Sequence, residues 1–415
     1  MRILQVGVFL LITFTVAAHG AVEVWAQTVV EIGAALLFLL WVLGFLISNE
    51  REIYWSVLNW PVVAVLLWAL LQLIFRITVY PYLTWTTLLL WTACFLIYFV
   101  GSQVFQDKSS LRMLAWFFMS LAFATALLGI IQYFTSNGKL YWIRELTQGG
   151  EFFGPYVNRN HFAGLMELLV PVGLAMLIFH GVRRDLEFLV TLLTVIPVGA
   201  IFLAGSRGGL VSFAFEIAFL AVIYFVRKTG TIRWAPLLAF VLVLLSLLLW
   251  IGVGTVVGPL YRKTASDLTL SRRRSMFIDT AHVFLKHPIA GTGLGTLVDV
   301  YPLYDTAYDG KLVDHAHNDY IEAASDLGLP GVLCGILFLG LLARQGFSTL
   351  ETPQSHFSTA YHAAALIACG GLLVHSFVDF NLHIPSNALI FLFQANLAVT
   401  VPLSQDRATK RKYST

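Results

Sequence analysis

Long apolar segments follow one another along most of this chain, and no other feature limits its fold as strongly. An apolar run of about 20 residues matches a hydrocarbon core roughly 30 Å thick, so each run is a candidate membrane-spanning helix. Only 12% of the residues are charged, which is about half the proportion in a soluble domain. Most of the surface must therefore face lipid, and we expect an all-α polytopic membrane protein.

We count about twelve candidate spans by length and hydropathy. They are residues 3–19, 27–48, 60–76, 84–101, 112–134, 161–180, 187–204, 208–226, 233–253, 328–345, 358–376 and 387–403. We expect residues 1–403 to form a single helical bundle domain. It would include one large polar loop at 254–327, and a basic tail would follow at 404–415.

Lysine and arginine gather in alternate connections between these spans, which is the usual orientation signal of a membrane protein. With both termini inside, the inner segments carry Arg51, Lys108, Arg112, Arg183, Arg184, Arg227, Lys228, Arg233, Arg344, Arg407, Lys410, Arg411 and Lys412. The segments 135–160, 206–207, 254–327 and 378–385 then share the outer face. Every unusual polar cluster falls in this set, which predicts one site at the outer end of the bundle.

The net charge of +3 follows from these orientation signals, and we expect no nucleic-acid partner. The three cysteines, Cys94, Cys334 and Cys369, lie in apolar runs. A buried thiol that acts as a small apolar side chain is the ordinary interpretation of such a position.

Three of the outer polar clusters contain arginine. They are Asn158-Arg159-Asn160 at the start of a span, Ser206-Arg207 at the junction of two spans, and Arg272-Arg273-Arg274 at the start of an amphipathic stretch. Arginines and helix N-termini both bind phosphate well. Each cluster also has a structural interpretation, namely a capped helix, an arginine that reaches the interface, or a helix that binds lipid phosphates.

A Gly-x-Gly-x-Gly run at Gly291, Gly293 and Gly295 resembles a nucleotide-binding loop only superficially. No strand precedes it, and the Lys-Ser/Thr of a P-loop is missing. We interpret it as a turn that lets the large loop fold back.

The stretch from Asp314 to Tyr320 is the most unusual polar segment, because it holds His315, His317 and Asp319 close together. A metal site, a structural histidine and an acid–base group are the three interpretations. Two histidines without further ligands at a recognisable spacing are weak evidence for metal. Imidazole titrates near pH roughly 6.5, so we favour a general base or acid.

A last polar segment near the C-terminus contains His375, Asp379, Asn381 and His383. It can line the same cavity. We nevertheless favour a polar loop without catalytic duty.

Together these clusters offer arginines and helix N-termini for a diphosphate, and a histidine base, at a membrane surface. A lipid-linked diphosphate sugar carries its own leaving group and lives in the membrane. The chemistry that fits is glycosyl transfer, in which a base deprotonates an acceptor hydroxyl and arginines stabilise the diphosphate.

The motifs resemble those of bacterial O-antigen ligases and the related polysaccharide polymerases and protein O-oligosaccharyltransferases. His317-Asn318, nine further residues and then Gly328-Leu329-Pro330-Gly331 is similar to the ligase signature. Ser206-Arg207-Gly208-Gly209, Asn158-Arg159-Asn160, and Arg274 ahead of His287-Pro288 and the glycine run also resemble family motifs. Family members often carry tryptophan three residues after that arginine, where this chain has Phe277.

The resemblance implies a GT-C-like bundle of twelve spans in the bacterial cytoplasmic membrane, with amphipathic helices in a large periplasmic loop. The donor would be an undecaprenyl-diphosphate-linked glycan and the acceptor a glycolipid, a polysaccharide or a protein. Catalysis would be inverting, without metal or other cofactor. The base would be His317, and Arg207, Arg274 and Arg159 would bind diphosphate. Supporting residues would be Asn318, His315, Asp319, Ser206 and Asn160.

Two alternatives stay open. A polymerase of the same superfamily differs from a ligase only in its acceptor. A flippase for lipid-linked sugars should carry charged residues through the middle of several spans, whereas here only Glu31, Glu167 and Glu216 lie well within spans.

Overall fold

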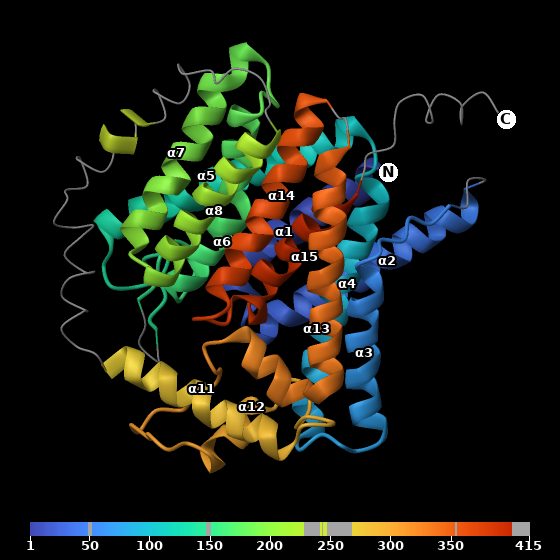
Figure 1. Cartoon of the computed structure of the whole chain (residues 1–415), viewed down its shortest axis with the longest axis vertical. Helices are drawn as coiled ribbons and strands as arrows, with labels where there is room; N and C mark the ends of the chain where they lie inside the picture. Colours follow the sequence, from blue (N-terminus) through green and yellow to red (C-terminus); the bar gives the residue numbers. More distant parts are fainter. Residues whose placement is uncertain are drawn as a thin grey trace.

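The computed structural model describes residues 1–48, 52–146, 151–227, 241–242, 244–246, 268–352 and 355–400. Helices dominate these residues (Figure 1). The helices are α1 (Arg2–Ala17), α2 (Val24–Ile47), α3 (Asn59–Ile74), α4 (Pro81–Val104), α5 (Lys108–Thr135), α6 (Arg159–Ile178), α7 (Glu187–Ala204), α8 (Arg207–Arg227), α11 (Leu268–Lys286), α12 (Leu297–Val300), α13 (Asp319–Glu351), α14 (His356–His375) and α15 (Pro385–Val399). The expected all-α architecture is confirmed for the part of the chain that is described.

Eight of these helices are long and apolar enough to cross a membrane, namely α2, α4, α5, α6, α7 with its preceding turn, α8, α13 and α14. The apolar helices α1, α3 and α15 are shorter, with 16, 16 and 15 residues. The predicted span 233–253 falls almost wholly outside the described residues. A multi-pass membrane protein is therefore supported, while the number twelve stays a prediction.

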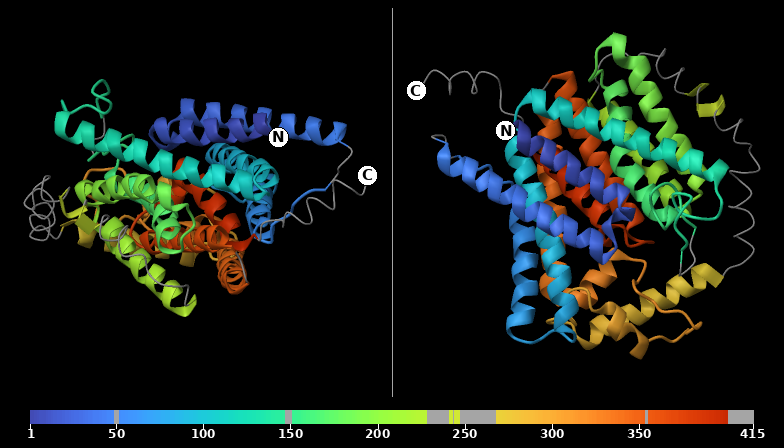
Figure 2. Two further views of the ribbon diagram at one scale, coloured as in Figure 1. Left: turned by 90° about the horizontal axis from the view of Figure 1, so that it is seen from above. Right: turned by 180° about the vertical axis from the view of Figure 1, so that it is seen from behind.

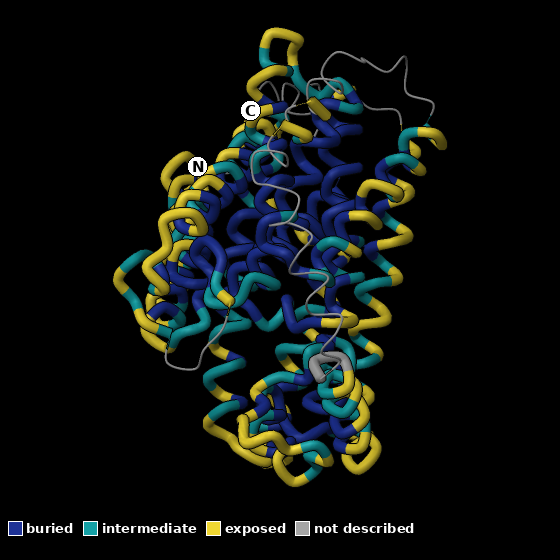
Figure 3. Tube along the Cα trace, turned by 90° about the vertical axis from the view of Figure 1, so that its left-hand side faces the viewer, coloured by how far each residue is buried: buried dark blue, intermediate teal, exposed yellow. Residues whose placement is uncertain are grey.

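The centre of the bundle is α6, which packs against α14, α7, α5 and α8. In α6, 94% of the most apolar stretch is buried inside the protein, against 17% in α2. Figure 3 shows this buried core in the middle of the bundle and exposed residues along its outside. Views from above and behind show α1, α2 and α5 along one side of the bundle (Figure 2). The exposed apolar side chains of α2 are expected of a helix that faces lipid.

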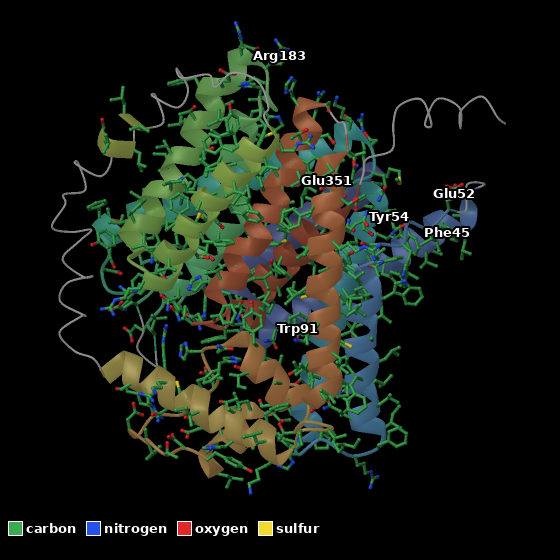
Figure 4. All side chains as sticks on the ribbon, viewed as in Figure 1. Phe45, Glu52, Tyr54, Trp91, Arg183 and Glu351 are labelled. Atoms are coloured by element: carbon green, nitrogen blue, oxygen red, sulfur yellow. The ribbon has the colours of Figure 1, made fainter. Side chains whose placement is uncertain are left out.

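A small polar layer built from α11, α12 and the loop 304–318 covers one end of the bundle (Figure 1). Its own small core contains Leu297, Tyr301, Val313 and Ala316. Arg183 and Glu351 lie toward the opposite end, as the labelled side chains in Figure 4 show. The two ends of the bundle therefore differ in structure.

Helix α13 is longer than the predicted span 328–345. The hydropathy pattern placed residues up to 327 in the loop and began the span at 328, but the helix already begins at Asp319. Gly328 interrupts it with φ 63° and ψ −158°. Because the first turns before this kink are polar, hydropathy detects only the apolar helix that follows.

The two glycine motifs lock this kink in place. Leu329 N donates to the Pro288 carbonyl at 2.8 Å, and Gly293 N donates to the Asp326 carbonyl at 2.9 Å. Gly291, Gly293 and Gly295 all have positive φ, the conformation that glycine adopts most easily. The glycine run therefore joins the polar layer to the kink of α13, nine to eleven residues after His317.

Candidate active site

Polar side chains from five elements meet at the end of the bundle that the polar layer covers. They come from the starts of α6, α8 and α13, from α11, and from the segment between α14 and α15 that includes the 3-10 turn η4 (Asn381–His383). Four of the five polar clusters of the sequence meet around one carboxylate. Within the described residues, the fifth cluster, Ser206-Arg207 at the start of α8, forms no hydrogen bond or ion pair with that carboxylate.

That carboxylate is Asp379, which is fully buried. Its Oδ1 lies 3.1 Å from Nδ1 of His317. Its Oδ2 accepts a hydrogen bond of 2.6 Å from Asn160 and lies 3.5 Å from Nη2 of Arg273. Nε2 of His161 lies 3.7 Å from Oδ1. Burial alone would raise the pKa of Asp379, but the imidazoles of His161 and His317 hold it well below its usual range.

The contact with Asp379 fixes the tautomer of His317. An ionised carboxylate only accepts hydrogen bonds, so Nδ1 of His317 carries the proton and Nε2 keeps its lone pair. The His317 side chain is 24% exposed, so a substrate can reach it. A buried carboxylate that orients an imidazole in this way is the usual arrangement for a histidine general base.

The backbone around His317 is held in an unusual conformation. His317 has φ 49°, which is uncommon for a residue with a Cβ and costs free energy. Asn318 caps α13 by accepting hydrogen bonds of 3.0 Å from the amides of Tyr320 and Ile321, and it donates to the Phe377 carbonyl at 2.9 Å. The asparagine of the His-Asn motif thus fixes the backbone next to His317.

A second network surrounds His315. Its Nδ1 lies 2.6 Å from Oε1 of Glu322, and Nε2 of His383 lies 3.3 Å from the same oxygen. Nδ1 of His383 contacts Asp319 at 2.8 Å. Burial would lower the pKa of His383, but the carboxylates of Glu322 and Asp319 raise it to about 10.

His315, Glu322 and His383 could together bind a metal ion, since their ligand atoms lie within 4.8 Å of one another. Around a tetrahedral zinc ion with bonds near 2.0–2.1 Å, two ligand atoms lie about 3.3 Å apart. The separation between His315 and Glu322 is 2.6 Å, the length of a charge-assisted hydrogen bond. The geometry therefore fits a hydrogen-bonded ion-pair network better than a metal centre.

The three arginines at the start of α11 have different surroundings. Arg272 forms a bidentate pair with Asp305 at 2.7 and 2.8 Å, which anchors the polar layer. Arg273 donates to the Val378 carbonyl at 2.7 Å and points at Asp379. Arg274, the residue favoured from the sequence, is exposed. The structure thus brings Arg273, and not Arg274, to the carboxylate that holds His317.

Arg207 lies at the junction between α7 and α8, and Arg159 of α6 lies near Gly205 of the same junction. Ser206 caps α8 by accepting from Gly209 N at 3.1 Å. Within the described residues, Nη2 of Arg207 is buried without a hydrogen-bond acceptor, so it has a donor available for an anion. Arg159 is paired with Glu151 at 2.5 Å. Gly208 lies against the imidazole of His375, which connects this junction to the end of α14.

Several residues at this site were missed or given little weight in the sequence. They are Asp379, Glu322, His383, His161 and Arg273. Asp379 and His383 stood in the segment that we interpreted as a loop without catalytic duty, 62 and 66 positions after His317 in the chain. Only their polar character in an apolar chain pointed to them, and sequence distance concealed the contact.

A family model described as O-antigen ligase matches residues 192–336 of this chain. The matched part runs from α7 into α13 and includes Arg207, Arg273 and His317. The resemblance to the O-antigen ligase and polymerase superfamily is thereby confirmed, and a function of that type is supported. Comparison with curated proteins found no match.

Proposed function

We propose that this protein is a glycosyltransferase that moves a glycan from an undecaprenyl-diphosphate carrier to an acceptor hydroxyl. It would work at the periplasmic face of a bacterial inner membrane, with both termini in the cytoplasm. The observation that carries the proposal is the Asp379–His317 pair with Arg273 beside it. A base and a phosphate-binding cation lie together at one end of a membrane bundle.

In the reaction, Nε2 of His317 takes the proton of the acceptor hydroxyl, and the oxygen attacks the anomeric carbon from the side opposite the diphosphate. The anomeric configuration is therefore inverted. Arg273 and Arg207 stabilise the charge on the departing diphosphate, and Arg159 joins them if the substrate displaces Glu151. Asp379 keeps the imidazole oriented and stabilises the imidazolium that forms. No step requires a metal ion.

Glycan transfer by a ligase and by a polymerase requires the same donor site, so the acceptor distinguishes them. A flippase would need polar groups along the length of the helices. In the described residues, Glu167 and Glu216 are buried within the bundle, but the partly exposed imidazoles of His315 and His317 lie together at one end, against Phe380. This distribution favours an enzyme with one active face.

The direct test is transfer in vitro. The purified protein is supplied with a defined undecaprenyl-diphosphate glycan and, in parallel, with a glycolipid, a polysaccharide or a protein acceptor, with and without EDTA. We expect product with at least one acceptor, inverted anomeric configuration by NMR, and no effect of EDTA. No product with any acceptor would contradict the proposed function, and loss of product with EDTA would contradict the metal-independent mechanism.

A further inference from the structure

Two imidazoles stand against one aromatic ring at this site. His315 stacks on Phe380 with ring centroids 4.2 Å apart, and His317 meets the same ring edge-on at 4.9 Å. The two side chains are 28% and 24% exposed, and each holds its Nδ1 against a buried carboxylate. Each therefore presents its Nε2 as the atom available to a substrate. The proposed function uses only one of them.

The charges around the two imidazoles differ. Asp379, the partner of His317, also has the guanidinium of Arg273 at 3.5 Å. One positive charge is thus already present for one negative charge, and His317 can remain neutral. A neutral imidazole with a free lone pair is what a base requires.

His315 lies in a network with two buried carboxylates, Glu322 and Asp319. Within the described residues, their ion-pair partners are His315 and His383. Buried carboxylates need compensating positive charge. His383 supplies one positive charge, as its raised pKa of about 10 indicates, and His315 is the group placed to supply the second.

We propose that His315 acts as an imidazolium that donates its Nε2 proton to the diphosphate leaving group, while neutral His317 accepts the proton of the acceptor hydroxyl. This inference rests on the proposed glycosyl transfer and adds a general acid to it. The two histidines would then have opposite roles, set by the carboxylates and cations around them.

Each bond that breaks in this step is matched by a bond that forms. The acceptor O–H bond breaks and its proton goes to His317, while the acceptor oxygen forms a bond to the anomeric carbon. The bond from that carbon to the phosphate oxygen breaks, and the electron pair leaves with the oxygen. That oxygen receives the proton of His315. Water then returns the proton from His317 to His315, so no net proton is gained or lost by the enzyme.

The groups that face His315 come from each element around it. They are Glu322 of α13, His383 of η4, His161 of α6 and His317 of its own loop, and Asp319 of α13 pairs with that His383. Glu322 is the nearest of the carboxylates, with Oε1 2.6 Å from Nδ1 of His315. Glu322→Gln therefore removes the negative charge that pairs with His315.

The test is the pH dependence of kcat for transfer by the full-length protein from a defined undecaprenyl-diphosphate glycan. The wild type should show a bell-shaped profile, because the reaction needs one group that accepts a proton and one that donates a proton. His315→Gln should lower kcat by about 10²- to 10³-fold and abolish the alkaline limb. His282→Gln, at an exposed position on α11, serves as the matched control and should behave like the wild type.

Glu322→Gln provides a second measurement that does not depend on the folding of the first variant. It should move the alkaline limb to lower pH, which a merely structural role of His315 would not predict. An alkaline limb that stays in place in the folded variants would overturn the general-acid role. If the wild type transfers glycan but His315→Gln keeps its rate and profile, this inference fails and the proposed function stands. If the wild type transfers nothing, the proposed function itself fails.

Discussion

Arg273 and Arg274 are adjacent in α11 but have different environments. Successive side chains of an α-helix point about 100° apart, so a helix that turns one arginine toward the site turns its neighbour away. Arg273 faces Asp379, whereas Arg274 is exposed. At the scale of single residues, this one step of helix phase decides which guanidinium lies beside the carboxylate that holds His317.

The first prediction compares these two arginines. Arg273→Gln should lower the transfer rate by about 10²- to 10³-fold, because it removes the positive charge that stabilises the diphosphate leaving group. Arg273→Lys should rescue it only partly, since an ammonium lacks the planar fork. Arg274→Gln is the matched control and should change the rate by less than about threefold. Equal losses in the two Gln variants would contradict the assignment of Arg273.

The sequence predicted some of these residues and not others for physical reasons. His317, Asn318 and Arg207 were recognisable because a polar motif in an apolar chain is conspicuous. The choice between neighbouring arginines depends on helix phase relative to a site that is not yet placed. Asp379 could not be assigned, because its contact with His317 joins segments far apart in the chain.

At the scale of elements, the glycine run between α11 and α12 packs against the kink of α13 at Gly328. A Cβ at Gly291 would overlap the carbonyl of Asp326, and its φ is 71°. The close backbone approach and the left-handed conformation both exclude larger side chains. The sequence indicated a turn here but could not show that its partner is the kink at Gly328.

The second prediction concerns this contact. Gly291→Ala should destabilise the protein by roughly 2–4 kcal/mol, the sum of left-handed strain and overlap, and should reduce transfer because the His317 loop loses its support. Gly335→Ala in α13 is the control, because a Cβ there meets open space. Thermal unfolding in detergent measures both. A Gly291→Ala variant as stable as the control would show that the close contact between the glycine run and α13 does not stabilise the protein.

The third prediction follows from the raised pKa of His383. Its folded-state pKa of about 10 lies above the unfolded value of roughly 6.5. The stabilisation is therefore complete below about pH 6.5 and is lost as the pH rises through about 10. The melting temperature of the wild type should fall over this window, and His383→Gln should show a smaller fall. Identical pH dependence in the two proteins would rule out the contribution.

At the scale of the whole molecule, the two ends of the bundle carry different groups. The polar layer, the paired histidines and Arg273 share one end, while Arg183 lies toward the other. The distribution of charge in the sequence already indicated this asymmetry through the positive-inside bias. The helix boundaries were harder to predict from the sequence, because hydropathy does not detect the polar turns at the start of α13.

The fourth prediction is that these ends lie on opposite sides of the membrane. In a background without the three native cysteines, Lys311→Cys should react with a membrane-impermeant maleimide in bacterial cells with an intact inner membrane. Arg183→Cys should react only after lysis. Both positions are exposed, so access to the side of the membrane decides the result. If Arg183→Cys alone reacted in intact cells, the protein would have the opposite orientation in the membrane.

The most direct test of the account is whether His317 is the base. Purified wild type and His317→Gln are compared for transfer from a defined undecaprenyl-diphosphate glycan, with thermal unfolding measured on the same samples. The account predicts that His317→Gln retains its fold and loses at least about 10³-fold in transfer rate. A folded His317→Gln variant that transfers glycan at a rate close to the wild type would contradict it.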